Sequence, residues 1–174
     1  MGTGAAVRLE PWGPQDAGLL RRLTGDPAMM EHLGGAAESD AKLAERQARY
    51  AAPQDPAVNG AFRVVDVASG TAAGWVGYWE HEWRAAMVYE MGWSVLPEFQ
   101  GRGIARAAAL AAIEVARAQR RHRHIHAFPA VANAASNAVC RAAGFTLLGE
   151  VDLDYPPGNM MRCNDWRLDL FAAS

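Results

Sequence analysis

The sequence predicts one α/β domain, of the α+β kind, built around a mixed sheet. Three observations predict this class. The chain has 174 residues, the usual size of one domain. Segments with strand-like alternation and segments with helical periodicity follow one another along it. No repeat, linker or change of composition divides the chain, so we expect residues 1–174 to form a single domain.

In the first half, turn and cap residues separate the segments. Pro11 ends a first strand, Asp16 is an N-cap, and Gly34 stops a short helix. The Ser69-Gly70 turn joins two strands and a third follows, so we expect an antiparallel meander. The predicted strands are 7–10, 61–67, 73–79 and 87–95, and the predicted helices are 17–23, 27–33 and 39–50.

The second half begins with an alanine-rich helix, predicted from Gly103 to about Gln119. Alanine favours the helix and permits close packing on a sheet. A short strand at 124–128 follows, then a helix at 136–143 that Gly144 ends. Two more strands are predicted, at 147–155 and near the carboxyl end, where Trp166, Leu168 and Leu170 point inward.

Composition excludes several classes of protein. The net charge of −2 does not favour nucleic-acid binding. No apolar run approaches the roughly 18 residues of a membrane span, and the first residues lack a signal-peptide pattern. The two cysteines are expected to be reduced thiols. We therefore expect a cytoplasmic protein that binds neither membrane nor nucleic acid.

The most informative segment is the turn Gln100-Gly101-Arg102-Gly103-Ile104-Ala105, between a strand and a helix. The start of a helix presents unpaired N–H groups and partial positive charge, so it binds phosphate oxygens. Glycine removes the side chains that would keep a diphosphate from the backbone. The chain is therefore predicted to hold a phosphate-bearing cofactor here.

Two common phosphate-binding loops fit poorly. A nucleotide-hydrolysing loop needs Gly-Lys followed by Ser or Thr, but the only lysine in the chain is Lys42. A dinucleotide-binding loop needs a third glycine, where this chain has Arg106, and an acidic residue about 20 residues later. Residues 118–126 contain no Asp or Glu.

Gln100-x-x-Gly103-x-Ala105 resembles the acetyl-CoA pyrophosphate loop of the GNAT N-acetyltransferases. Glu90 on the preceding strand strengthens the resemblance, as does the later Asn133-x-x-Ser136 segment with a helix ending in Gly144-Phe145. The similarity extends over nearly the whole chain. It is greatest to the branch that includes the ribosomal-protein N-terminal acetyltransferases.

The resemblance implies a fold and a cofactor, acetyl-CoA. A mostly antiparallel sheet of six to seven strands would carry helices on both faces and splay between strands four and five. The pantetheine arm would enter that gap, pairing with the backbone of Trp93 and Val95, with the Leu96 N–H toward the thioester. The residues expected to bind the cofactor are Trp93, Val95, Leu96, Gln100, Gly101, Arg102, Gly103, Ile104, Ala105, Asn133, Ser136 and Asn137.

The same resemblance suggests the catalytic groups, and no metal is required. Glu90 is the candidate base, with a structural carboxylate paired to an arginine as the alternative. Ser136 is the candidate for assisting the leaving sulfur, or it is only a helix cap. The tyrosine that many family members use is replaced by Cys140.

The predicted activity is transfer of an acetyl group from acetyl-CoA directly to a primary amine through a ternary complex. The acceptor is a protein N-terminus or a small-molecule amine, and His32, His81 or His126 could be a second base. The alternative is a non-catalytic acyl-CoA-binding relative that acts as a sensor or partner module. The resemblance also suggests a homodimer.

Overall fold

The computed structural model describes residues 4–173 and contains a seven-stranded sheet of order β1-β2-β3-β4-β5-β7-β6. Every neighbouring pair is antiparallel except β4 and β5, so the predicted mixed, mostly antiparallel sheet is confirmed. The strands are β1 (Val7–Pro11), β2 (Asn59–Asp66), β3 (Thr71–Trp83), β4 (Ala86–Val95), β5 (His124–Ala127), β6 (Thr146–Asp154) and β7 (Met160–Asp169).

Four α-helices and three short 3-10 helices are formed by the described residues. The α-helices are α1 (Ala17–Thr24), α2 (Asp40–Ala51), α3 (Ile104–Gln119) and α4 (Ala134–Ala142). The 3-10 helices are η1 (Pro14–Asp16), η2 (Pro27–Met30) and η3 (Pro97–Phe99). Within residues 4–173, no helix has both the length and the apolar character needed to cross a membrane.

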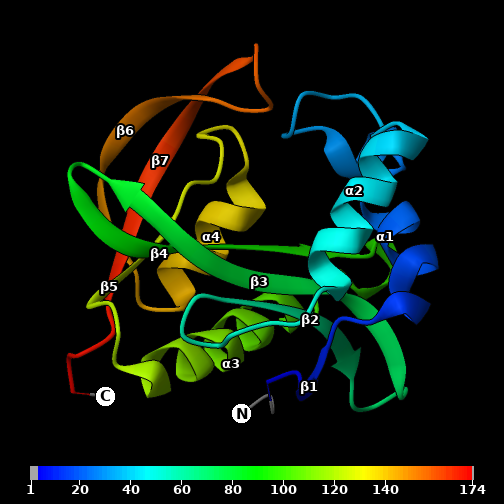
Figure 1. Ribbon diagram of the computed structural model, residues 1–174, viewed down its shortest axis with the longest axis horizontal. Helices are drawn as coiled ribbons and strands as arrows, with labels where there is room; N and C mark the ends of the chain where they lie inside the picture. The colour runs from blue at the N-terminus through cyan, green and yellow to red at the C-terminus, as the bar shows by residue number, and fades with distance from the viewer. Residues whose placement is uncertain (1–3, 174) are drawn as a thin grey trace.

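Helices cover both faces of the sheet, as expected (Figure 1). α1 and α2 lie together on the face that carries Trp75, on which Tyr50 of α2 stacks with 5.0 Å between ring centroids. α3 crosses the other face against β1 to β4, and its buried side consists of alanine and isoleucine. α4 lies beside α3, where the Trp166 indole of β7 donates to Asn137. Small side chains let α3 approach the sheet closely.

β4 and β5 pair over a short stretch only. Tyr89 and Glu90 of β4 face Ile125 and His126 of β5. Beyond His126, β5 continues along β7, and β4 runs on to Val95 without a partner on that side. The predicted splay between the fourth and fifth strands is therefore confirmed, and Glu90 lies at its apex.

The β3–β4 hairpin is longer than the sequence predicts. β3 continues past Trp79 to Trp83, which pairs with Ala86. Arg84 and Ala85 form the turn with φ of 52° and 61°. Residues other than glycine, asparagine and aspartate seldom adopt this conformation, so the sequence gives no turn signal here. In the predicted helix 27–33, only the 3-10 helix η2 forms.

Candidate active site at the splayed strands

The turn before α3 has the geometry of an anion site. Gly101 and Gly103 adopt φ of 74° and 80°, and a Cβ built on either would meet no atom within 4 Å. Among the described residues, no backbone carbonyl accepts from the N–H groups of residues 101–106, and no side chain caps α3. These donors lie at the positive end of a sixteen-residue helix. The arrangement suits a diphosphate.

The side chains of the turn point back to the sheet. Gln100 donates from Nε2 to the Val95 carbonyl at 2.9 Å. Arg102 donates from Nη2 to the buried Asp66 carboxylate at 3.0 Å. The cradle therefore consists of backbone N–H groups. Because the Arg102 guanidinium is bonded to Asp66, the prediction that Arg102 binds the cofactor applies to its backbone N–H group.

The free edge of β4 presents backbone groups to the splay. N–H and C=O groups along a strand alternate between its two edges. Leu96 donates its N–H to the Ala73 carbonyl of β3 at 2.8 Å, so the N–H groups of Trp93 and Val95 point to the open edge. The expectation that the Leu96 N–H faces the thioester is therefore wrong: β3 occupies that donor. The expectation for Trp93 and Val95 stays a prediction that this geometry supports.

Glu90 has the environment of a base. Its side chain is 24% exposed, and burial raises the pKa of the carboxyl to about 7, with Trp79 opposing only part of the shift. The titratable side chain nearest to the Glu90 carboxyl among the described residues is His81, with 3.4 Å from Nδ1 to Oε2. Burial lowers the pKa of His81, so the imidazole is neutral near pH 7. The alternative, in which Glu90 is paired to an arginine, is not observed among the described residues.

A buried His–Asp pair lies beside Glu90. His126 Nδ1 is 2.6 Å from Oδ1 of Asp165, whose other oxygen accepts from the Trp83 indole at 3.0 Å. Asp165 escaped the sequence analysis. Its position next to the inward-facing Trp166 in a predicted strand was the one sequence feature that could have indicated a buried carboxylate. Within residues 4–173, these side chains do not form a cluster that could hold a metal ion.

Asn133 and Ser136, at the start of α4, have different roles. The sequence left open whether Ser136 only caps the helix. Asn133 caps the helix, accepting from the Ser136 N–H at 3.0 Å, so Ser136 is not the cap. The Ser136 side chain remains half-buried at the first turn. Cys140, one turn later, is fully buried, and burial raises the pKa of its thiol to about 12.

Asn137 joins the loop before α4 to β7, and its binding of the cofactor stays a prediction. Its amide nitrogen donates to the Ala130 and Asn133 carbonyls at 2.9 and 2.8 Å. Its oxygen accepts from Asn164 and Trp166, both at 2.8 Å. With 7% exposure and both ends of the amide engaged, its side chain is a member of a buried hydrogen-bond network.

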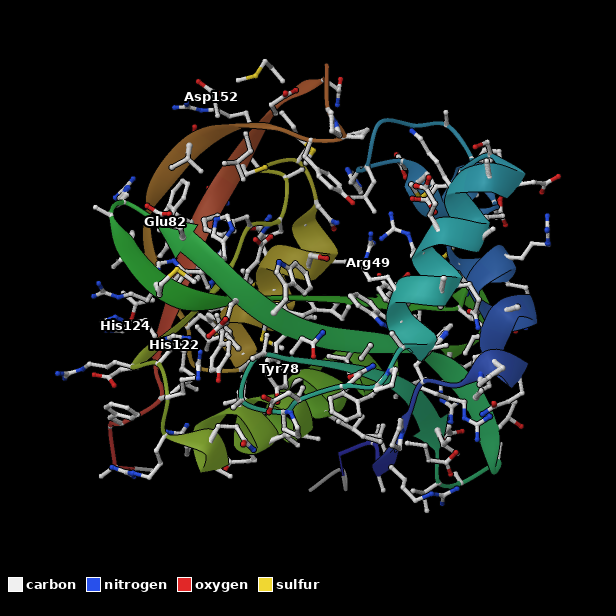
Figure 2. All side chains as sticks on the ribbon, in the orientation of Figure 1. Arg49, Tyr78, Glu82, His122, His124 and Asp152 are labelled. Carbon is white, nitrogen blue, oxygen red and sulfur yellow. The ribbon has the colours of Figure 1, made fainter. Side chains whose placement is uncertain are left out.

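A row of aromatic rings leads to Glu90 on the same face of the sheet. Tyr50 stacks on Trp75, and Trp75 lies 6.4 Å from Trp79, which pairs with Glu90 in the β3–β4 register. Gly77 makes this possible, because a Cβ there would lie 2.6 Å from the Trp75 ring. Figure 2 shows Arg49 beside α2 on the side toward α4, and its guanidinium lies over the Tyr50 ring at 5.6 Å.

Three loops line an open cavity of about 680 Å³, called here the three-loop cavity. They are the segment after η2, the β5–α4 loop and the β6–β7 turn, which contribute His32, Val131 and Met160 among others. The first and third loops approach each other where a Cβ on Gly34 would lie 3.3 Å from Pro156. This cavity is the candidate entrance for an acceptor.

A family model described as an acetyltransferase (GNAT) domain matches residues 6–146. The chain belongs to the GNAT acetyltransferase family. The matched region includes the turn before α3, Glu90 and α4. The predicted GNAT membership is thereby confirmed. Among curated proteins, none matches the chain significantly.

Solved structures share the GNAT fold over almost the whole chain. A GNAT acetyltransferase from Bacillus anthracis has a TM-score of 0.78 at 15% identity, covering 99% of this chain and 100% of that chain. Spermidine N-acetyltransferase from Vibrio cholerae, with CoA and spermine, has a TM-score of 0.76 at 16% identity, covering 94% and 95%. RimL, a ribosomal L7/L12 alpha-N-protein acetyltransferase in complex with coenzyme A, has a TM-score of 0.76 at 17% identity, covering 97% and 96%.

Proposed function

We propose that this GNAT protein transfers an acetyl group from acetyl-CoA directly to a primary amine in a ternary complex. One observation carries the proposal: the unpaired N–H cradle at α3 adjoins the open edge of β4, and that edge ends at the half-buried Glu90. A diphosphate in the cradle would direct an extended arm along β4 toward Glu90. Two proteins of similar fold, the spermidine enzyme and RimL, are described with CoA bound.

In the proposed reaction, the amine nitrogen attacks the thioester carbonyl carbon and the C–S bond breaks. Glu90 takes the proton that the amine loses, directly or through a water. Its pKa of about 7 leaves a large fraction ionised at neutral pH while keeping it basic enough to hold that proton. The Val95 N–H at the open edge replaces Leu96 as candidate donor to the developing oxyanion. Ser136 remains the candidate for assisting the leaving sulfur, by donating a hydrogen bond from its hydroxyl to the thiolate, which takes its proton from solvent.

The acceptor is a small-molecule amine or a peptide N-terminus, and it would enter through the three-loop cavity. Proteins of similar fold act on both kinds of amine, spermidine and a ribosomal protein N-terminus. The aromatic row of Tyr50, Trp75 and Trp79 offers ring faces to a cation on its way to Glu90. A homodimer and a cytoplasmic location stay predictions.

Calorimetry of acetyl-CoA binding tests the cofactor assignment. Gly103→Glu places an anion where the diphosphate would lie, and we expect binding to be lost. Gly149→Glu is the matched control, because Gly149 also has a positive φ, 147°, and open space, but lies in β6. It should bind like wild type. Absence of binding by wild type would overturn the proposal.

A second measurement separates an enzyme from a binding module. Thiol release from acetyl-CoA is followed with a panel of polyamines, amino acids and peptides. Release that depends on an amine supports transfer. Binding without release for every amine would favour the non-catalytic alternative.

A further inference from the structure

Asp66 is a buried carboxylate that no step of the proposed reaction uses. It ends β2, and its side chain is 3% exposed. One of its oxygens accepts from the Ser69 hydroxyl at 2.8 Å and from Arg102 at 3.0 Å. These donors, Ser69 first and Arg102 second, keep its pKa below the usual value although burial opposes this. The carboxylate is therefore ionised at neutral pH, and its main charged partner belongs to the turn before α3.

Arg102 lies in the part of that turn whose backbone is intrinsically the most flexible. It lies between Gly101 and Gly103, which both have positive φ. Glycine loses the most backbone entropy when its conformation is fixed, so a turn with two glycines is mobile unless neighbours hold it. The Arg102 guanidinium is held by Asp66 and by the face of Phe99, 5.4 Å from the ring centroid. Phe99 is itself buried at 8% exposure.

Gln100 holds the other side of the turn through its bond to the Val95 carbonyl. The turn is thus fastened to β4 by Gln100 and to the end of β2 by Arg102. Neither side chain fills the space above the glycines, which stays open. The hydrogen bonds of Gln100 and Arg102 hold the backbone of the turn, and neither side chain occupies the cradle.

We propose that Asp66 is a positioning residue for the cofactor turn, holding it through Arg102 in its binding conformation before acetyl-CoA arrives. The proposal rests on the function proposed above for this site. Preorganisation raises affinity because the cost of ordering the turn is met during folding instead of during binding. Asp66 therefore acts on acetyl-CoA affinity and touches neither the acceptor nor the thioester.

The competing explanation is that Arg102 binds a phosphate directly, with Asp66 as a resting partner. The two ideas predict opposite results for Asp66→Asn. If Arg102 binds phosphate, freeing its guanidinium leaves affinity unchanged or improves it. If Asp66 positions the turn, Asp66→Asn and Arg102→Met weaken binding alike, and the double variant is no worse than either single one.

The experiment measures Kd for acetyl-CoA, and KM and kcat, for wild type, Asp66→Asn, Arg102→Met and the double variant. We expect Kd and KM to rise by about tenfold in all three variants, with kcat nearly unchanged and acceptor KM unaffected. Arg102→Lys, which keeps a cation near Asp66, should recover part of the loss. Unchanged or tighter binding by Asp66→Asn, or additive losses in the double variant, would overturn the proposal.

Asp16→Asn is the matched control. Asp16 is also 3% exposed and pairs with an arginine, Arg63, at 3.2 Å, but away from the turn. It should lower the melting temperature without changing acetyl-CoA KM. An equal KM change in both Asp variants would mean that general destabilisation is responsible.

NMR order parameters of the Gly101 and Gly103 N–H groups give a readout that needs no cofactor. We expect values near the rigid-backbone level of about 0.85 in wild type and a fall toward about 0.6 in Asp66→Asn. If wild type fails to bind acetyl-CoA, the proposed function fails while this readout still decides the positioning role. Equal order parameters in both proteins would overturn that role.

Discussion

Glu90 of β4 and His126 of β5 face each other at the last parallel pair of these strands. One register position therefore fixes two things. It sets where the strands begin to diverge, and it places the carboxylate at that apex. His126 also bonds Asp165 of β7 at 2.6 Å, so a buried side-chain pair joins β5 to β7 beside the backbone pairing of β4 with β5. This rigidity suits a base whose distance to a bound thioester must be reproducible.

Glu90→Gln should lower kcat/KM by about 10²- to 10³-fold, because the amide cannot accept the amine proton. In wild type, kcat/KM should show a rising limb through the Glu90 pKa of about 7, since only the ionised carboxylate is a base, and a second rise where the amine itself titrates. The variant should lose this limb and retain only the titration of the amine. Acetyl-CoA affinity, measured by calorimetry, should be unchanged. Activity within tenfold of wild type would remove Glu90 from the mechanism.

The same carboxyl should make stability depend on pH. Its pKa is raised in the folded state, so its contribution is fully present below the unfolded value of about 4.5 and is lost as pH rises through about 7. Relative to Glu90→Gln, wild type should therefore lose up to about 3 kcal/mol of unfolding free energy between pH 5 and pH 8. Urea unfolding of both proteins across this range measures the difference. A pH-independent difference would show that Glu90 is not desolvated in solution.

The sequence predicted the features that depend on local pattern. The glycine-containing turn at a helix start indicated the phosphate cradle. The alternation along β4 placed Glu90 and Tyr89 on different faces of the sheet. The resemblance supplied the splay, which no single segment could reveal. The cradle and the position of Glu90 follow from residues close together in the chain, whereas the splay came from the family resemblance alone.

What the sequence could not predict depends on contacts between distant segments. Asp165 reaches His126 across 39 positions, and Arg102 reaches Asp66 across 36. The Leu96 N–H is committed to Ala73 by the β3–β4 register, which becomes definite only when the hairpin forms. Asn137 shows the same limit, since an Asn near a helix start looks equally suited to a ligand and to a buried network.

Asn137→Ala should destabilise the protein by about 2–4 kcal/mol, because it leaves the buried Trp166 indole N–H without its acceptor and removes a side-chain donor from the Ala130 and Asn133 carbonyls. Denaturant unfolding measures the loss. Asn159→Ala is the control: the Asn159 amide also bonds a carbonyl, of Tyr155 at 3.1 Å, but in an exposed turn. It should cost well under 1 kcal/mol, as surface substitutions usually do. Equal losses would contradict the role of Asn137 as a buried hub.

Ser136 and Cys140, one turn apart on α4, should respond differently to substitution. Ser136→Ala should lower kcat by about 10- to 100-fold with little change in acetyl-CoA Kd, because the leaving thiolate loses the hydrogen bond from its candidate donor. Cys140→Ala should keep kcat and lose some stability through the small cavity it creates. Amine-dependent thiol release and thermal unfolding, measured on both variants, separate the two effects.

Alkylation gives an independent check on Cys140. With full burial and a pKa raised to about 12, its thiol should resist iodoacetamide at pH 8 while the protein is folded and react once it is unfolded. Rapid modification of the folded protein, or loss of turnover in Cys140→Ala, would show that this thiol lies open to the reacting centre. In that case the assignment of the leaving-group role to Ser136 would have to pass to Cys140.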